Sequence, residues 1–419
     1  MKDLRSHFLD HIKKGLGGRP LALKIRFWDG YEYSFADPAA VVIELRTSQL
    51  VSRLLMGSAL DVLGEAYVEG EVGLEGRYQD ILAVAEGLNR AFPKKKEGNR
   101  PRWFGRRAHS KEKDAESIQY HYDVSNDFYR LWLDRNMAYS CAYFKTGKED
   151  IDLAQEQKFA HICRKLHLQP GEKLLDIGCG WGGLLAWAAQ HHDIQGVGVT
   201  LSEAQYHYAK ERMEREGLAD RVEIRLQDYR DIPERDHFDK VVSVGMFEHV
   251  GRQHLSEYFG VIRRVLKEGG WVLNHGITAS QQDDEGGHHS GSDFIDKYVF
   301  PDGEIPHLWR VVHEMAGQDL EVLDVENLRP HYAQTLIHWV RRLEAHKDEA
   351  VALVGDKRYR IWAIYMAGCA YGFWRNWSAL HQVLAVKQTG EELTPRPWER
   401  RYQYADESFR LAEPDWGDL

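Results

Sequence analysis

The feature that most restricts the fold is a regular alternation of apolar runs and helical segments between residues 151 and 277. Apolar residues recur at helical spacing in 151–168 and in 202–218, where Ser202 is expected as the N-cap. The apolar runs between such helices have the length of strands: LLDIGC, IQGVGVTL, VEIRLQD, KVVSVGMF and WVLNHGI. Strands alternating with helices predict an α/β fold with a mostly parallel sheet, covered on both faces, and ligands at the carboxyl ends of its strands.

A second, smaller domain is expected because 419 residues exceed what one such fold needs. In residues 1–92, LALKIRFWDGYEYSF predicts a hairpin turning at Asp29 and Gly30, and a strand and helices follow. This segment holds no group of residues suited to catalysis. We therefore expect a small α+β N-terminal domain for lipid binding or dimerisation, a catalytic domain at 115–390 and a C-terminal tail at 391–419.

A basic segment at residues 93–114 is expected to link the two domains. Residues 90–113 contain ten Lys or Arg against two Glu, interrupted by Pro and Gly. One interpretation is a solvated connector. Another is a surface for anionic phospholipid headgroups, with Trp103 and Phe104 at the bilayer interface. DNA is disfavoured as a partner because the formal net charge of the chain is −10.

The composition is that of a soluble protein from a reducing compartment. The chain has four cysteines and no CxxC pair, which disfavours both a disulfide framework and a zinc site. The N-terminus lacks the apolar core of a signal peptide, and no apolar run is long enough to span a membrane. We therefore expect a cytoplasmic protein without a metal site.

A glycine-rich turn in LLDIGCGWGG predicts a nucleotide site, because Gly178, Gly180 and Gly183 match G-x-G-x-x-G after a strand. A dinucleotide would require an acidic residue at the end of the second strand, but Thr200 stands there. Asp176 instead precedes the glycines, where its carboxylate would repel a pyrophosphate and attract a sulfonium or ammonium group. This order favours S-adenosylmethionine over NAD, and the other interpretation is a plain tight turn.

The next strand ends in Asp228 and Tyr229. A carboxylate there can accept a hydrogen bond from the adenine amino group, and the tyrosine ring can stack on the base. Both residues are therefore predicted to contact the adenosyl part of the cofactor.

Six segments together resemble the cyclopropane-fatty-acyl-phospholipid synthases and the related mycolic acid cyclopropane synthases: HYDVSNDFY (121–129), YSCAYF (139–144), LLDIGCGWGG (174–183), TLSEAQ (200–205), MFEHVG (246–251) and YVFPDGEIP (298–306). The resemblance covers about residues 115–390, whereas the glycine turn alone would indicate only a class I methyltransferase. It implies a Rossmann-like class I S-adenosylmethionine-dependent methyltransferase fold. With the residues argued above, it implies a cofactor site of Tyr139, Ser140, Asp176, Gly178, Cys179, Gly180, Trp181, Gly182, Gly183, Thr200, Leu201, Gln205, Asp228 and Tyr229.

The resemblance also implies a reaction. A methyl group from S-adenosylmethionine is added to a cis double bond in an acyl chain of a membrane phospholipid, and the resulting carbocation loses a proton and closes to a cyclopropane. Family members hold bicarbonate as the base, and the corresponding pocket here consists of Cys141, Glu248, His275, the backbone of Ile277, and Tyr332. Glu248 beside an anion requires either a proton shared with bicarbonate or a charged His275, and both alternatives are open at this point.

Each of these residues also has an ordinary structural interpretation. Cys141 and Cys369 are typical small buried residues, His275 can be a satisfied core histidine, and Tyr332 can pack at a helix start. Cys369 is kept as a catalytic candidate only because it matches a cysteine once proposed in the family as a nucleophile. That role does not suit an unactivated alkene, which reacts with electrophiles and not with thiolates. The aromatic residues of 360–377 are expected mostly in the core, with a few along an acyl tunnel.

The segments 347–361 and 392–409 differ from the enterobacterial members of the family. The alternative function is therefore a C-methyltransferase of unsaturated acyl chains without ring closure. A lipid-binding protein with a vestigial cofactor pocket is disfavoured by the intact glycine turn. A nucleic-acid methyltransferase is disfavoured because the chain has no NPPY-like segment.

The expected partners are membrane phospholipids with unsaturated acyl chains and a second copy of the chain. We expect peripheral binding to the anionic inner face of the membrane through Arg100, Arg102, Arg106, Arg107 and Trp103. A homodimer is expected to form through the small domain, because two linked weak contacts hold a protein on a bilayer better than one.

Overall fold

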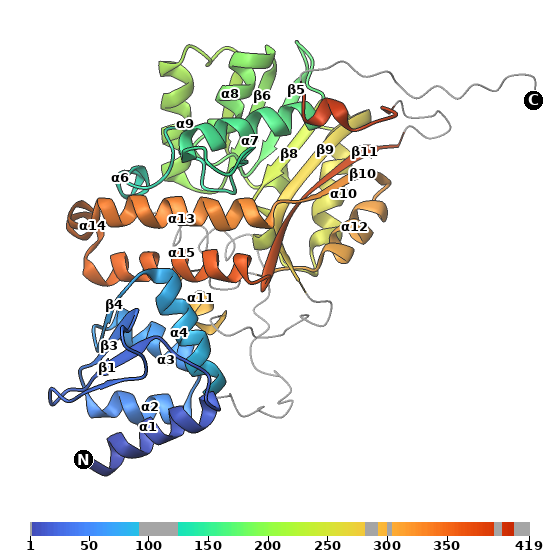
Figure 1. The fold of residues 1–419 in the computed structure, drawn as a ribbon. Coiled ribbons are helices and arrows are strands. Elements are labelled where there is room, and N and C mark those ends of the chain that lie inside the picture. Colours follow the sequence, from blue (N-terminus) through green and yellow to red (C-terminus); the bar gives the residue numbers. More distant parts are fainter. Residues whose placement is uncertain (1, 92–124, 281–291, 300–303, 389–395, 406–419) are drawn as a thin grey trace, which may run out of the picture. The chain divides into compact units, whose positions relative to one another are not determined.

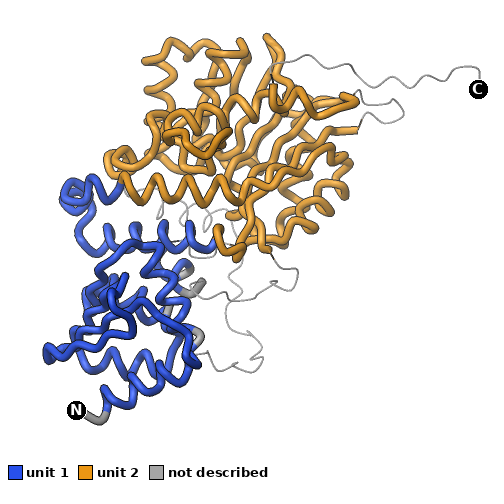
Figure 2. Tube along the Cα trace, viewed as in Figure 1, with its two compact units in different colours: residues 1–108, 286–301, 343–372 blue, residues 109–285, 302–342, 373–419 orange. Residues whose placement is uncertain are grey.

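The computed structural model describes residues 2–91, 125–280, 292–299, 304–388 and 396–405 (Figure 1). Contacts divide the chain into two compact units (Figure 2). Unit 1 consists of residues 1–108, 286–301 and 343–372, and unit 2 of residues 109–285, 302–342 and 373–419.

This division differs from the contiguous catalytic domain expected at 115–390, because 286–301 and 343–372 cluster with the N-terminal residues. The expected linker at 93–114, with its arginines and Trp103, lies outside the described residues. The expected tail at 391–419 is described only from 396 to 405.

Unit 1 contains a four-stranded sheet in the order β2-β1-β3-β4. Its strands are β1 (Leu23–Arg26), β2 (Glu32–Ser34), β3 (Val41–Leu45) and β4 (Val72–Glu75). β1 and β2 pair antiparallel on either side of Asp29 and Gly30, which confirms the predicted hairpin, whereas β3 pairs parallel with β1. Its helices are α1 (Lys2–Leu16), α2 (Ser48–Met56), α3 (Ala59–Val68), α4 (Tyr78–Ala91), α11 (Ser292–Tyr298), α14 (Lys347–Val354) and most of α15 (Asp356–Trp374).

The alternation of side chains along the strands explains how unit 1 forms its hydrophobic core. Leu23 and Ile25 of β1 point to one face of the sheet, because successive residues of a strand face opposite sides. They pack in one apolar cluster with Ile12 of α1, Leu50 of α2 and Leu88 of α4.

Polar contacts show why two late segments of the chain belong to unit 1. Lys297 of α11 pairs with Glu65 of α3 at 2.7 Å. Arg360 of α15 donates a hydrogen bond to the carbonyl oxygen of Tyr67 at 3.2 Å. The local sequence of these two segments does not predict contacts with residues 65 and 67.

Unit 2 contains a seven-stranded sheet in the order β10-β11-β9-β8-β5-β6-β7. Its strands are β5 (Lys173–Ile177), β6 (Gln195–Thr200), β7 (Val222–Leu226), β8 (Phe238–Val244), β9 (Leu266–Ala279), β10 (Leu320–Asn327) and β11 (Ser378–Lys387). β5 to β9 pair parallel, and β11 pairs antiparallel with both β9 and β10. The five predicted strands and the mostly parallel sheet are confirmed.

Helices cover both faces of this sheet, as predicted. The helices of the unit are α6 (Asn126–Arg130), α7 (Ile151–Lys165), α8 (Gly183–His192), α9 (Glu203–Arg215), α10 (Leu255–Val265), α12 (Leu308–Ala316) and most of α13 (Arg329–Ala345). Leu174 of β5 packs in a cluster with α7, α8 and α9, whereas its neighbour Leu175 packs in a cluster with α10 and α12. Ser202 caps α9 as expected, because its Oγ accepts a hydrogen bond from the Gln205 amide at 3.3 Å.

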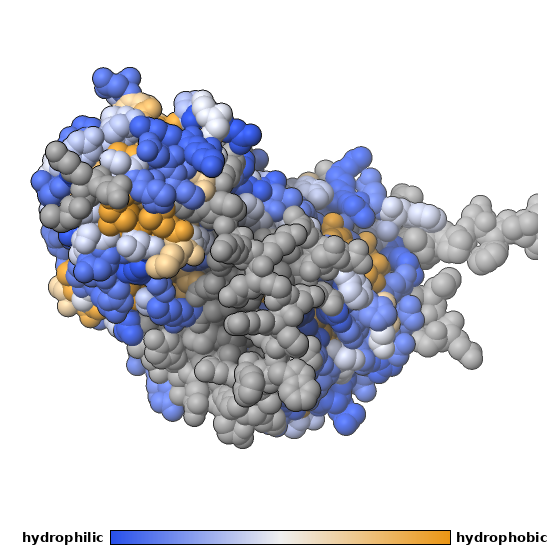
Figure 3. Space-filling view, turned by 90° about the horizontal axis from the view of Figure 1, so that it is seen from below, coloured by the Kyte–Doolittle hydropathy of each residue, from blue (hydrophilic) through white to orange (hydrophobic). Residues whose placement is uncertain are grey.

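The described surface is mixed in character. Hydrophilic residues surround several groups of hydrophobic ones on the face shown in Figure 3. Among the described residues, no helix is long and apolar enough to cross a membrane.

Candidate functional site

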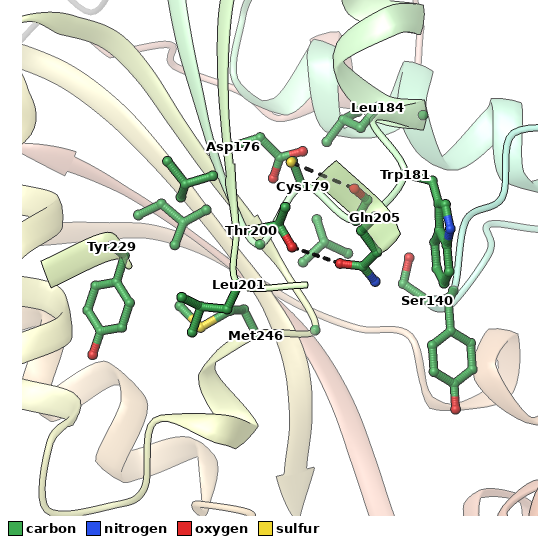
Figure 4. Close-up of a pocket in the computed structure, with 18 of the residues that line it drawn as sticks. Ser140, Asp176, Cys179, Trp181, Leu184, Thr200, Leu201, Gln205, Tyr229 and Met246 are labelled. Atoms are coloured by element: carbon green, nitrogen blue, oxygen red, sulfur yellow. Dashed lines mark hydrogen bonds between the residues drawn. The ribbon is translucent and has the colours of Figure 1, made fainter. Parts of the chain in front are cut away.

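A pocket in unit 2 lies at the carboxyl ends of β5, β6, β7 and β8 (Figure 4). It is also lined by the turn after β5, by residues 137–140 and by Lys158 of α7. All residues predicted to bind the cofactor, except Gly182, line this pocket. Parallel strands that end at one edge of a sheet thus bring together residues that are far apart in sequence.

The turn after β5 depends on its glycines. Gly178 and Gly180 have φ values of +81° and +55°, in the left-handed region that side chains disfavour. A Cβ on Gly178 would lie 2.9 Å from Cγ of Met246, which follows β8. Glycine therefore allows the turn to bend sharply and to pass close to the next wall of the pocket.

Asp176, the last residue but one of β5, is a buried carboxyl group of this pocket (Figure 4). Burial raises its pKa to about 7, and the charge of Lys158 opposes that rise. Among the described residues, its Oδ1 has no hydrogen-bond partner. A buried carboxylate is costly unless a cation or donor meets it, so this atom suits the ammonium and sulfonium groups of S-adenosylmethionine.

Side chains at the ends of β6 and β7 fix two further walls. Thr200 Oγ1 donates a hydrogen bond to Gln205 Oε1 at 2.8 Å (Figure 4), which ties the end of β6 to the first turn of α9. Asp228 accepts hydrogen bonds from Arg230 at 2.9 and 2.6 Å. This internal partner of Asp228 was not predicted from the sequence. The roles of Asp228 and Tyr229 toward adenine remain predictions.

Helix α7 holds the wall formed by residues 137–140, a role that was not predicted from the sequence. Gln155 Nε2 donates hydrogen bonds to the carbonyl oxygens of Ala138, at 3.1 Å, and Ser140, at 2.9 Å. Lys158 Nζ donates to Ser140 Oγ at 2.8 Å. The available signal was spacing, because residues three apart share one face of a helix.

A second group of predicted residues lies on β9 and in the short turn after β8. Glu248 Oε1 accepts a hydrogen bond from the backbone amide of Ile277 at 2.7 Å. His275 lies two residues earlier on β9 and therefore on the same face of the strand as Ile277. Its Nδ1 is 3.2 Å from Nε2 of Gln382 on β11. Glu248 Oε2 and His275 Nε2 are buried and have no hydrogen-bond partner within the described part of the chain.

Burial acts on these two groups in opposite directions. It raises the pKa of Glu248 to about 7 and lowers the pKa of His275 well below its usual value. Desolvation penalises the charged form of each group, so it favours a protonated carboxyl and a neutral imidazole. Of the two alternatives left by the sequence, a proton on Glu248 is therefore favoured over a charge on His275.

Cys141 and Tyr332 lie near the start of α13. The Cys141 thiol is 3.2 Å from the carbonyl oxygen of Ala142, and burial raises its pKa. The Ala142 amide donates to Thr335 Oγ1 at 3.0 Å, one helical turn after Tyr332. The ring of Tyr332 packs against that of Phe373, with centroids 4.7 Å apart. None of the five residues predicted for the bicarbonate pocket lines the cofactor pocket, although their neighbours Ser140, Met246 and His249 do.

Cys369 lies in the part of α15 that belongs to unit 1. Burial raises the pKa of its thiol to about 12, so the thiol stays protonated at neutral pH. A half-buried, protonated thiol agrees with the chemical argument against a nucleophilic cysteine. Trp362, Tyr365 and Phe373 of the same helix are buried, as expected for core aromatics, whereas Trp374 is 68% exposed.

Comparison with known proteins agrees with this geometry. A family model described as mycolic acid cyclopropane synthetase matches residues 109–383, and a model of a domain of unknown function matches residues 19–97. A probable fatty acid methyltransferase of Pseudomonas putida is 46% identical over 94% of this chain and 100% of its own length. The cyclopropane-fatty-acyl-phospholipid synthase of Escherichia coli K12 is 40% identical over 60% of this chain and 63% of its own length.

Solved structures show the same architecture. The cyclopropane synthase MmaA2 of Mycobacterium tuberculosis has a TM-score of 0.62 and 33% identity, over 65% of this chain and 98% of its own. The mycolic acid cyclopropane synthase CmaA1, complexed with SAH and CTAB, has the same TM-score, identity and coverage. The chain therefore belongs to the mycolic acid cyclopropane synthetase family and has the fold of an S-adenosylmethionine-dependent methyltransferase.

Proposed function

We propose that this enzyme adds a one-carbon unit from S-adenosylmethionine to a cis double bond in an acyl chain of a membrane phospholipid and closes a cyclopropane ring. The observation that carries the proposal is that Glu248 and His275 each have one buried polar atom without a hydrogen-bond partner among the described residues. Methyl transfer to an alkene leaves a carbocation that must lose a proton, so a buried group that can take part in proton transfer supports this chemistry.

The cofactor residues fit an adenosyl sulfonium ligand. S-adenosylmethionine supplies an electrophilic methyl group when bound. Asp176 offers its unpartnered Oδ1 to the cationic part, and the glycine turn leaves room for close approach of the ligand. Thr200 holds Gln205 at the edge of the same pocket.

The proposed chemistry needs one proton to leave. The alkene π electrons form the new carbon–carbon bond as the carbon–sulfur bond breaks, which leaves a carbocation on the acyl chain. Loss of a proton from the added carbon lets its C–H electron pair close the ring. Glu248 is suited to hold a proton at this point, since burial raises its pKa to about 7. Bicarbonate is a weak base and would accept the proton. It is a small planar anion that can both donate and accept hydrogen bonds, so Glu248 Oε2 and His275 Nε2, which have no partner among the described residues, would hold it.

Aromatic rings near the cofactor pocket support a cationic intermediate. The ring of Tyr139, which lines the pocket, lies 5.3 Å from that of Trp339, and Trp339 lies 6.1 Å from Tyr332. Tyr332 in turn contacts Phe373. Such rings exclude water, which would otherwise quench a carbocation, and their faces attract positive charge.

C-methylation without ring closure is the second candidate. Two relatives that match most of this chain are named probable fatty acid methyltransferases, that of Pseudomonas putida and one of Mycobacterium tuberculosis with 38% identity over 90% of the chain. The first chemical step would be the same, and the carbocation would lose a proton from a neighbouring chain carbon instead of from the added one. The two candidates differ only in which proton is removed.

We also propose where the reaction takes place and how the enzyme assembles. The substrate double bond lies within a bilayer, so we propose peripheral binding through the basic segment 93–114 and dimer formation through unit 1. The charge of that segment supports attraction to anionic headgroups.

The test of the acid–base group compares Glu248→Gln with wild type in buffers stripped of carbon dioxide, with and without added bicarbonate. The variant keeps the shape and the acceptor for the Ile277 amide, so cofactor affinity measured by calorimetry should change little. Turnover should fall by roughly 100-fold or more, and bicarbonate should stimulate only the wild type. Glu257→Gln, at an exposed carboxylate of α10, is the matched control. Full activity of Glu248→Gln together with indifference of the wild type to bicarbonate would show that the proton leaves by another route.

A further inference from the structure

Lys158 of α7 is a buried cation that the function described so far does not use. Its side chain is 2% exposed and lines the cofactor pocket. Its Nζ donates one hydrogen bond, to Ser140 Oγ at 2.8 Å, and lies 4.6 Å from the centre of the Phe159 ring. Within the described part of the chain it has no carboxylate partner, although an ammonium group has three protons to donate.

A second buried lysine on the same helix, in contrast, forms ion pairs with carboxylates. Lys165, two turns later, is equally buried, but it pairs with Asp324 at 3.2 Å and with Glu326 at 2.6 Å. Lys158 has no such pair, and burial lowers its pKa to about 8, with opposing attraction from Asp134, Cys141 and Asp176. A buried ammonium group without a carboxylate in direct contact is costly, so its presence at the wall of a ligand pocket calls for a ligand that supplies one.

The same pocket also contains a buried carboxyl group, that of Asp176. Asp176 lines the pocket with Oδ1 unpartnered, and no salt bridge joins it to Lys158 among the described residues. One buried anion and one buried cation, kept apart in one pocket, match a zwitterion. The amino-acid end of S-adenosylmethionine is such a zwitterion, with an ammonium and a carboxylate on one carbon.

We propose that Lys158 binds the carboxylate of the cofactor's amino-acid moiety, while Asp176 faces its ammonium group. This inference rests on the proposed use of S-adenosylmethionine and adds a residue that discriminates the cofactor from adenosyl compounds without a carboxylate. The hydrogen bond to Ser140 orients the ammonium toward the pocket, and one or two of its remaining protons go to the ligand.

The competing role is purely structural: Lys158 would hold Ser140 and the wall 137–140, and nothing more. The two roles differ in their dependence on the ligand. Loss of the wall weakens every adenosyl ligand, whereas loss of a carboxylate partner weakens only ligands that carry the carboxylate.

The experiment measures binding of two probes by calorimetry, S-adenosylhomocysteine and its decarboxylated analogue, to wild type and Lys158→Met. Loss of a charged hydrogen bond should weaken S-adenosylhomocysteine roughly 10- to 100-fold. The decarboxylated analogue should bind both proteins within about threefold, because it never contacted the ammonium. Lys158→Gln is the second variant if Lys158→Met does not fold, since Gln keeps a donor for Ser140 without the charge. Lys210→Met, at an exposed lysine of α9, is the matched control and should keep the preference for the carboxylate.

An equal loss for both probes, or no loss for either, would overturn the role of Lys158 and leave the cofactor assignment standing. Failure of the wild type to bind either probe would instead overturn the cofactor assignment itself. The two failures are thus distinguishable in one set of titrations.

Discussion

Asp176 and Glu248 are both buried carboxyl groups with pKa values raised to about 7, but their surroundings differ. Asp176 has the cation Lys158 nearby and faces the pocket, which suits a carboxylate that meets a cationic ligand. Glu248 is tied to the backbone of β9 through Ile277 and shares its neighbourhood with a neutral His275. The first arrangement suits binding of charge, and the second suits exchange of a proton.

The Glu248 carboxyl should make the stability of the fold depend on pH. Its pKa is raised from 4.5 to about 7, so the folded state binds a proton that the unfolded state has lost in this window. The stabilising contribution of the protonated carboxyl is complete below about pH 4.5 and is lost as pH rises through about 7. At about pH 8, Glu248→Gln should therefore exceed wild type in free energy of unfolding, on the order of 3 kcal/mol, with little difference near pH 4.5.

Denaturant titrations of both proteins at these two pH values check this expectation. Glu257→Gln, at an exposed carboxylate, should show no such dependence. Parallel curves for Glu248→Gln and wild type at both pH values would mean that Glu248 is solvated in the folded protein.

Gly276 should be intolerant of a side chain because it lies between His275 and Ile277 on β9. A Cβ at this position would lie 1.8 Å from Cε1 of Phe247, the residue before Glu248. Phe247 would have to move, and Glu248 with it. Gly276→Ala should lower stability by roughly 1–3 kcal/mol and reduce turnover more strongly than cofactor affinity.

Thermal melts, calorimetry and turnover on one preparation separate these effects. Gly368→Ala, where an added Cβ would have no described atom within 4 Å, is the control and should be neutral or slightly stabilising within its helix. Normal turnover of Gly276→Ala would contradict the assigned position of Glu248.

Helix α7 connects the core of unit 2 to the cofactor pocket. One face contributes Phe159 and Ile162 to the apolar cluster beneath the sheet, and Gln155 and Lys158 reach the wall 137–140. Gln155→Leu removes two hydrogen bonds to that wall, one to the buried carbonyl group of Ala138 and one to the half-buried carbonyl group of Ser140. We expect a loss of roughly 1–3 kcal/mol in stability and weaker binding of S-adenosylhomocysteine, by roughly 10-fold.

Calorimetry and denaturation of Gln155→Leu provide the measurement. Gln190→Leu, on the exposed side of α8, removes one surface hydrogen bond to Glu216 and should change neither quantity appreciably. Unchanged cofactor affinity in Gln155→Leu would show that the wall 137–140 orders itself without α7.

The parallel strands could be predicted from sequence because each is a continuous apolar run between helices. β10 and β11 could not, since polar side chains occupy buried positions in both. Gln382 and Lys387 of β11 are fully buried, and Asp324 of β10 is 5% exposed while its neighbour Val325 is 37% exposed. Lys387 is satisfied by the carbonyl oxygen of Leu266 at 2.8 Å, a partner that only the folded sheet supplies.

In the site as well, residues that form a local sequence motif could be predicted, whereas residues whose partners are brought close only by the fold could not. The glycine turn and Asp176 form one local motif, so their chemistry is visible in a short segment. Lys158 and Gln155 act on residues about 15 to 18 positions earlier in the chain. A lysine on a helix is usually a solvated residue, and only the fold shows that this one is buried.

The chain as a whole does not divide at the boundaries that composition suggests. The basic segment 93–114 marks a change in charge, but α13 and α15 both continue from one compact unit into the other. A helix gives no local sign of such a crossing, so the contribution of 343–372 to unit 1 appears only in the contacts.

Membrane association is predicted to depend on charge. Raising salt from about 0.1 M to about 1 M shortens the screening length from about 10 Å to about 3 Å, so binding to vesicles with anionic phospholipid should weaken. Replacement of Arg100, Arg102, Arg106 and Arg107 by Gln should weaken binding at low salt in the same way. Co-sedimentation with anionic and neutral vesicles provides the measurement.

A control with an equal change in charge replaces four exposed arginines elsewhere by Gln, namely Arg77, Arg130, Arg215 and Arg401. If both sets of changes weaken binding equally, the effect comes from net charge and not from the basic segment. Equal binding to anionic and neutral vesicles at low salt would contradict an electrostatic contact altogether.

The chemical structure of the product tests most directly whether the enzyme closes a cyclopropane ring on a phospholipid acyl chain. The purified protein is incubated with S-adenosylmethionine labelled with carbon-13 in its methyl group and with vesicles of a phospholipid that has one cis double bond per chain. Fatty acids released from the lipid are then analysed by mass spectrometry and NMR. We predict the gain of one CH₂, loss of the olefin signals, and the label in a ring methylene with upfield proton signals. A label found in a methyl branch or in a new double bond would contradict ring closure, and an unlabelled lipid would contradict the assignment of acyl-chain methyl transfer.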